Sequence, residues 1–122
     1  MSTLSSGQTL VGKYYLLESA EEVGDLASDT ISYQFPLAST PVTNYRPPDT
    51  APTANCPGTE DNPQAAPGNL CVYSEERDVD ATYSGDGFDH DRVDRFGAGL
   101  AVRSSTAVGP FFDVGTWAVT AP

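Results

Sequence analysis

Short segments in which apolar and polar residues alternate with a period of two constrain the fold of this chain more than any other feature. The segment 30–37, TISYQFPL, is the clearest, because its odd positions are all apolar and its even positions are polar residues or proline. Such alternation is typical of a strand with one buried face. Four further segments read as strands, namely residues 8–17, 69–74, 99–105 and 114–121.

A helical pattern is hard to find in this sequence. Residues 18–29, ESAEEVGDLASD, come nearest, but Gly24 interrupts them and their apolar positions are few, so a loop or a single turn fits equally well. Several strands without helical crossovers predict an all-β fold, an antiparallel β-sandwich of jelly-roll type. At 122 residues the chain is expected to form one domain, residues 1–122.

The segment 8–17, QTLVGKYYLL, is apolar on both parities. Leu10, Tyr14 and Leu16 share one parity, and Val11, Tyr15 and Leu17 share the other. A strand of this kind needs cover on both of its faces. We therefore expect subunit contacts along it.

The charge balance excludes several classes of function. The chain has 17 acidic and six basic residues, a formal net charge of −11, and Lys13 is its only lysine. Nucleic acids and anionic membrane surfaces are bound mainly through lysine and arginine, so we expect neither as a partner. An apolar run of about 18 residues, the length that spans a bilayer, is absent, as is the basic and apolar pattern of a signal peptide.

The two cysteines flank an excursion rich in glycine and proline. A disulfide between Cys56 and Cys71 is the simplest interpretation, and closing a loop of about 15 residues would stabilise the fold by roughly 3 kcal/mol. Free buried thiols are the alternative. A zinc site needs four ligands, which the cysteines and His90 do not supply, and the spacing is unlike that of a redox pair. The disulfide implies an extracellular location, a cell surface or a virion surface.

An acidic stretch between residues 75 and 94 is the richest cluster of potential metal ligands, and calcium is the natural hypothesis because it takes six to eight oxygen ligands in variable geometry. The spacing does not match an EF-hand, which needs glycine at its sixth position and glutamate at its twelfth. A solvated acidic loop, partly neutralised by nearby arginines, is the competing interpretation. The candidate ligands are Asp78, Asp80, Asp86, Asp89, Asp91 and Asp94.

The sequence offers little that is typical of an enzyme. Common nucleophile, metalloprotease and phosphate-binding motifs are absent. His90 is the only histidine, and its neighbours FDHDR read as a solvated loop, so we expect no catalytic residues. The tyrosines and Trp117 fit a core or a subunit interface, although they could also form a platform on which sugars stack.

One block of the sequence resembles a known type of domain. It reads C-P-G…P-x-A-A-P-G-x-L-C-V-Y, and it is matched by Cys56, Pro57, Gly58, Pro63, Ala65, Ala66, Pro67, Gly68, Leu70, Cys71, Val72 and Tyr73. With the flanking ISYQFPLAS and GTWAVTAP it is similar to a C-terminal domain of uncharacterised actinobacterial and phage-associated secreted proteins, often found behind collagen-like stalks.

The resemblance implies a non-enzymatic β-domain with an architecture like the trimeric jelly rolls of C1q and tumour necrosis factor. This sequence shows no stalk before residue 1, so the domain is either the tip of a stalk that has been removed or a free-standing subunit. We expect a homotrimeric structural or adhesive subunit of an extracellular fibre, a pilus-like filament or a phage tail appendage. The alternative is a monomeric carbohydrate-binding module, with or without calcium. A cell-surface glycan or protein is the expected external partner.

Overall fold

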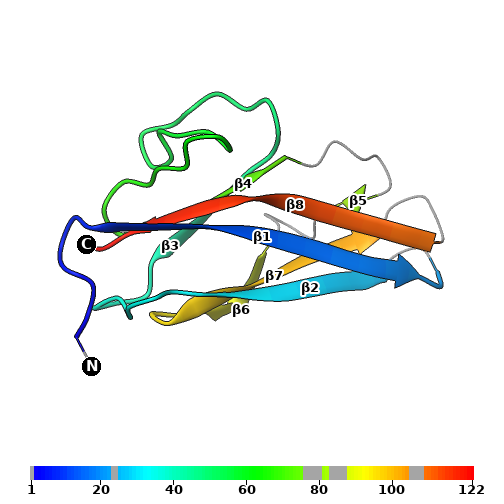
Figure 1. Ribbon diagram of the computed structural model, residues 1–122, viewed down its shortest axis with the longest axis horizontal. Coiled ribbons are helices and arrows are strands. Elements are labelled where there is room, and N and C mark those ends of the chain that lie inside the picture. The colour runs from blue at the N-terminus through cyan, green and yellow to red at the C-terminus, as the bar shows by residue number, and fades with distance from the viewer. Residues whose placement is uncertain (1, 23–24, 76–80, 83–87, 105–108) are drawn as a thin grey trace.

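The chain folds into two layers of β-sheet, as Figure 1 shows. The structure is a computed structural model that describes residues 2–22, 25–75, 81–82, 88–104 and 109–122. All regular secondary structure in these ranges is β-strand, so the predicted all-β fold is confirmed. The strands are β1 (Thr9–Ala20), β2 (Leu26–Ser32), β3 (Val42–Arg46), β4 (Asn69–Ser74), β5 (Ala81–Thr82), β6 (Phe88–Val93), β7 (Gly97–Ser104) and β8 (Gly109–Thr120).

The two sheets divide the strands between them. Sheet A has the order β1-β8-β4-β3, and sheet B has the order β2-β7-β5, with β6 also pairing with β7. The first strand therefore pairs with the last and the second with the last but one, in nested antiparallel pairs. One expectation was wrong in detail, because β3 runs parallel to β4 and makes sheet A mixed. The jelly-roll form of the sandwich stays a prediction.

The hydrophobic core lies between the sheets. Leu16, Leu70 and Val119 of sheet A have at most 1% of their surface exposed, and they share a cluster with side chains of sheet B. Tyr33 reaches this core from the end of β2, where its ring centroid lies 5.9 Å from that of Trp117. In β4 and β8 the predicted apolar parity lies in the core shared with sheet B, and the other parity of β4 is buried as well.

Two aromatic rings lie over glycines of the neighbouring strand where β1 pairs with β8. Gly12 is opposite Trp117, and a Cβ at Gly12 would lie 2.7 Å from the indole ring. Gly115 is opposite Tyr14, and a Cβ there would lie 2.7 Å from the tyrosine hydroxyl oxygen and would collide with the carbonyl oxygen of Tyr73. Each glycine leaves the space that the facing ring fills, so this reciprocal pair fixes the register of β1 on β8.

Strand β2 is displaced from the segment predicted for it. It ends at Ser32, and beyond it the N–H of Tyr33 and the N–H of Leu37 donate to the carbonyls of Phe96 and Arg95, at 2.9 Å each. The bond of Tyr33 falls at the next position of the β2–β7 register, and the bond of Leu37 then holds the chain to the turn between β6 and β7. As a result Phe35, predicted to face the core, is 42% exposed.

Two segments that were not predicted as strands contain strands. In residues 18–29, where the sequence left a helix, a loop or a single turn open, residues 18–20 belong to β1 and residues 26–29 to β2, and the segment around His90, predicted to be a solvated loop, lies in β6. Strand β6 pairs with β7 at Phe88 and Val93, with an irregular register between them. Backbone pairing to an available edge of β7 thus outweighs the polar character of the segment.

Candidate functional site

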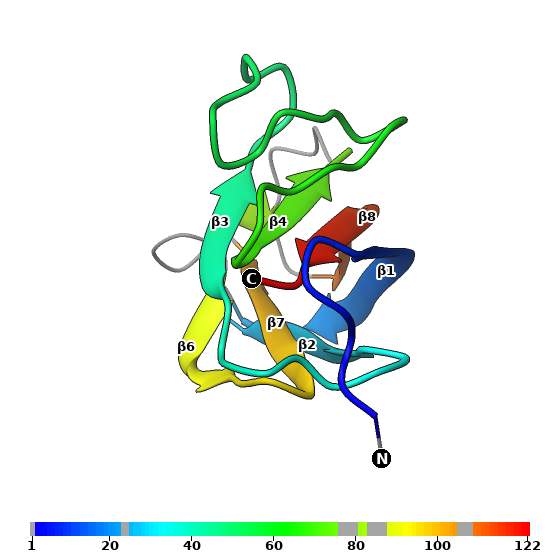
Figure 2. The same ribbon diagram turned by 90° about the vertical axis from the view of Figure 1, so that its left-hand side faces the viewer.

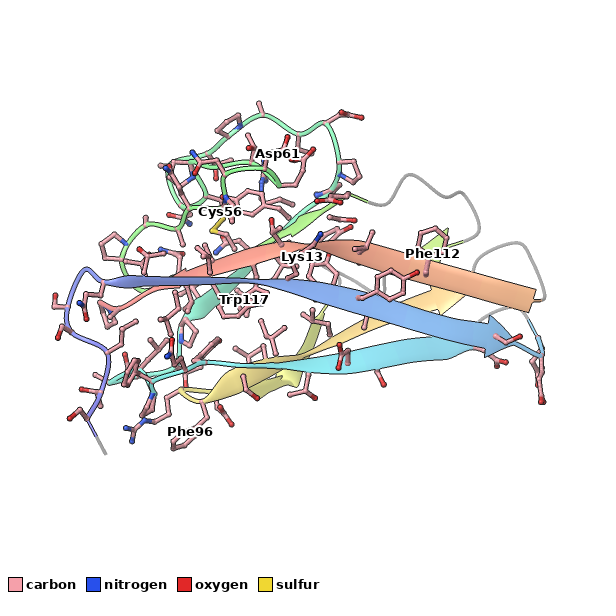
Figure 3. The ribbon with its side chains drawn as sticks, in the orientation of Figure 1. Lys13, Cys56, Asp61, Phe96, Phe112 and Trp117 are labelled. Atoms are coloured by element: carbon pink, nitrogen blue, oxygen red, sulfur yellow. A yellow bond between two sulfur atoms is a disulfide. The ribbon has the colours of Figure 1, made fainter. Side chains whose placement is uncertain are left out.

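The outer face of sheet A, which points away from sheet B, carries the features that distinguish this sandwich. Here the predicted disulfide is confirmed: Cys56 and Cys71 are joined, with their Cα atoms 5.8 Å apart. Cys71 belongs to β4, and Cys56 belongs to residues 47–68, which we call the disulfide loop. Figure 3 shows Cys56 and this loop above sheet A, with Trp117 on the opposite side of the sheet, between the two layers.

Side-chain hydroxyls of sheet A bind the backbone of the disulfide loop. The Tyr73 hydroxyl donates to the carbonyl of Gln64 at 2.6 Å and accepts from the N–H of Gly58 at 3.1 Å. The hydroxyls of Thr116 and Thr120 donate to the carbonyls of Glu60 and Ala65. Burial raises the pKa of Tyr73 above its usual range, so its hydroxyl also stays protonated in more alkaline solution than an exposed tyrosine would. The loop is therefore fixed at several points on the sheet.

The other half of the same face is not covered by the disulfide loop. Its exposed or half-buried side chains come from β1 and β8 and form what we call the open strip. Val11 is 59% exposed and Tyr15 is 54% exposed, which is high for apolar side chains in the middle of a strand. The open strip consists of Val11, Lys13, Tyr15, Phe112 and Val114. Lys13 and Phe112 lie on the same side of sheet A as the disulfide loop (Figure 3).

The open strip is chemically unlike the rest of the chain. The rings of Tyr15 and Phe112 are stacked, with centroids 6.2 Å apart and planes 6° from parallel. In a chain of net charge −11, the residues that β1 and β8 place on this face include Lys13 and no aspartate or glutamate. Glu75, whose N–H donates to the carbonyl of Val114, lies on the β4 side of β8, away from β1. An apolar strip free of carboxylates on two rigid strands is suited to contact another surface.

A groove of about 430 Å³ lies between the N-terminal segment and the start of β1. Leu4, Leu10 and Phe35 supply its apolar lining, and hydroxyl and amide side chains from residues 2–9 supply the remainder. Hydrogen bonds from the N–H of Leu4 to Pro36 and from the N–H of Gly7 to Ala121 hold the N-terminal segment in place. The combination of one aromatic ring with hydroxyl groups suits a small neutral polar ligand.

A buried polar group in sheet A was not anticipated from the sequence. Asp113 is only 1% exposed, and the Ser74 hydroxyl donates to its Oδ1 at 2.6 Å. Burial, and then the nearby charge of Asp113, raise the pKa of Tyr14 well above its usual range. The apolar parity of residues 112–119 gave a signal that Asp113 faces the core, but an isolated acidic residue in a strand is usually assigned to the surface.

The residues proposed as calcium ligands are only partly described. Asp78, Asp80 and Asp86 lie outside the described residues, as do the side chains of Asp89, His90 and Asp91. Asp94 caps the turn before β7, where its carboxylate accepts from the N–H groups of Phe96 at 2.7 Å and Gly97 at 3.2 Å. Within the described part of the chain, acidic, cysteine and histidine side chains do not gather into a group of three or more. Calcium binding stays a prediction.

Comparisons with protein-family models, curated proteins and solved structures found no match to this chain. The resemblance drawn from the block between Cys56 and Tyr73 therefore stays a prediction. The described residues also include no helix long and apolar enough to cross a membrane.

Proposed function

We propose that this chain is a non-enzymatic structural or adhesive subunit of an extracellular assembly, and that the open strip is its contact surface. The exposure of the open strip is the observation that carries the proposal. Tyr15 and Phe112 present apolar surface from two paired strands that are fixed by a continuous register. Rigid strands hold such side chains without a large loss of entropy on binding, which favours contact with a second surface.

The disulfide supports an extracellular setting, because such bonds persist in oxidising compartments. A fibre, a pilus-like filament and a phage tail appendage all fit a small, acidic subunit stiffened in this way. The homotrimer implied by the resemblance is one possible form of the assembly.

The test is the molar mass in solution by light scattering, measured with calcium and again with a chelator. A multimer under both conditions supports a structural subunit. A monomer under both conditions contradicts it and favours the binding module described next. A mass that falls on chelation assigns calcium to the assembly and directs mutagenesis to the aspartates between residues 78 and 94.

A carbohydrate-binding module is the second candidate, and two observations favour it. The stacked Tyr15 and Phe112 form an exposed aromatic surface, and Phe35 lines the groove with hydroxyl groups around it. Aromatic rings of this kind stack against the apolar face of a sugar. Retention on insoluble polysaccharides should then fall in Tyr15→Ala or Phe35→Ala. Phe96→Ala serves as the control, because Phe96 is 57% exposed and lies in the turn between β6 and β7.

A further inference from the structure

Strand β1 is one of the two edge strands of sheet A and lies at the rim of the sandwich (Figure 2). It pairs with β8 along all 12 of its residues in an uninterrupted register, and it contains no proline. Among the described strands only β8 pairs with it, because β2, the next strand along the chain, pairs with β7 in the other sheet. Long, regular edges of this kind are templates for pairing with another strand, and proteins usually shorten or interrupt them.

The hydrogen bonds of β8 show which residues of β1 direct their backbone groups outward. The carbonyls of Val114 and Thr120 accept from Glu75 and Gly68 on the β4 side. In an antiparallel ladder the backbone groups of successive residues point to opposite sides, so the odd residues of β8 bond to β1. Their partners on β1 are the even residues, from Leu10 to Leu16. The N–H and C=O groups of Val11, Lys13 and Tyr15 therefore face away from the sheet.

The same three residues carry the exposed side chains of the open strip. A strand that approaches the β1 edge thus meets free backbone groups together with apolar side chains and one ammonium group. The formal net charge of −11 opposes most contacts between copies, because it brings carboxylates together. Self-pairing through β1 reduces this repulsion at the contact, since the outer-face residues of β1 include no carboxylate.

We propose that β1 pairs antiparallel with β1 of a second copy of this chain, so that the two copies of sheet A form one continuous sheet about a two-fold axis. An axis at Lys13 would oppose two ammonium groups directly and is disfavoured. An axis at Tyr14 places Lys13 of each copy opposite Tyr15 of the other copy. The ammonium group of each lysine can then lie against an aromatic ring. The two open strips then merge into one larger face.

This inference rests on the proposed function, because it names the partner of a subunit whose contact surface is the open strip. It differs from that function in the number of copies that assemble, since a closed two-fold contact between identical strands yields dimers and not trimers. Light scattering separates the two ideas. A dimeric mass supports the inference. A trimeric mass that is unchanged by substitutions on β1 overturns the inference and leaves the structural subunit standing. A monomer at every concentration overturns both.

Lys13→Pro is the sharpest variant. Its N–H faces outward, so proline there removes a donor to the partner and leaves the ladder with β8 intact. Val11→Glu is the second variant, and it adds a carboxylate to the edge without altering the backbone. We expect each to raise the dissociation constant about tenfold or more, a change of about 1.4 kcal/mol. Val42→Glu is the matched control, because Val42 is 61% exposed on β3, the opposite edge of sheet A.

Amide hydrogen exchange gives a residue-level test. In a dimer, the amides of Val11, Lys13 and Tyr15 should be protected at high protein concentration and should exchange faster on dilution. The amides of Gly12 and Tyr14, which bond to β8, should stay protected throughout. Equal loss of a dimeric mass in Val11→Glu and Val42→Glu, or fast exchange of the three odd amides in the concentrated protein, would overturn the proposal.

Discussion

The outer face of sheet A has two halves. Both are made of β-strand, but one is covered by the disulfide loop and the other is exposed. Over β4 and the end of β8, the disulfide loop covers Cys71 and Tyr73, which are at most 4% exposed. Over β1 and the start of β8, Val11 and Tyr15 remain more than half exposed. The sequence of β1, which is apolar on both parities, predicted cover on both faces but not which parity would lie outside the core.

The disulfide loop has no regular secondary structure, so specific bonds must hold it on the sheet. The disulfide loop contributes few apolar side chains, and it is held by one covalent bond and by hydroxyls that bind its backbone carbonyls. The open half has no such covering in the described structure of a single chain, so we assign its cover to contact with other molecules. The two halves should therefore differ in how strongly each contributes to stability.

The largest effect is expected from removing the disulfide. In the double variant Cys56→Ala, Cys71→Ala the free energy of unfolding should fall by roughly 3 kcal/mol, because the loop of 15 residues is no longer closed in the unfolded chain. Denaturant titration with and without a reducing agent measures this. The reducing agent should destabilise the wild type and leave the double variant unchanged. An equal midpoint for both proteins would contradict the assigned role of the disulfide.

Two tyrosines on the same face provide a matched pair. Tyr73→Phe should lower the free energy of unfolding by about 1–3 kcal/mol, because it leaves the N–H of Gly58 and the carbonyl of Gln64 without their partner. Tyr15→Phe removes an exposed hydroxyl and should change stability by less than about 0.5 kcal/mol. Thermal or denaturant unfolding of the two variants side by side tests the comparison. Similar losses in both would show that the disulfide loop does not depend on Tyr73.

Alkaline pH should destabilise the fold. Burial raises the pKa of Tyr73 and, more strongly, the pKa values of Tyr14 and Tyr33 in the folded state. In the unfolded chain they ionise near pH 10, so above that pH the unfolded state has lost protons that the folded state keeps. Stability is therefore unaffected by these groups below about pH 10 and falls as the pH rises further. Denaturant midpoints between pH 8 and pH 11 measure this, and a midpoint that rises with pH would contradict it.

The smallest effect on stability is expected in the open strip. Val11→Ser should change the free energy of unfolding of the monomer by less than about 0.5 kcal/mol, because the side chain is mostly in water. Copies of the same variant should associate more weakly with one another than copies of the wild type do. Measuring stability at low protein concentration and molar mass at high concentration separates the two effects. A loss of several kcal/mol in the dilute protein would mean that Val11 is a core residue.

Much of the fold could be predicted from local pattern. Alternation identified β4 and β8 and the parity of each that faces sheet B, and the apolar run of residues 8–17 identified β1. Local pattern failed where strands depend on partners far along the chain. Polar β6 forms because β7 offers an edge, β3 joins β4 in parallel, and β2 ends early because the chain bonds to the turn at Arg95 and Phe96. Of the candidate site, the sequence predicted the disulfide and an apolar segment at residues 8–17 that needs cover on both faces, but not which side chains of that segment stay exposed.

The sequence by itself determined an all-β chain, three of the four strands of sheet A, the cysteine pair and the large negative charge, since each of these depends on side-chain periodicity or on counting residues. Only the tertiary structure decided which parity of β1 faces the core, that Asp113 is buried, and which half of the outer face stays open. The physical reason is that burial is a property of what lies opposite a residue. Gly12 and Gly115, by admitting Trp117 and Tyr14, turn one apolar face of β1 inward and leave the other to solvent or to a partner.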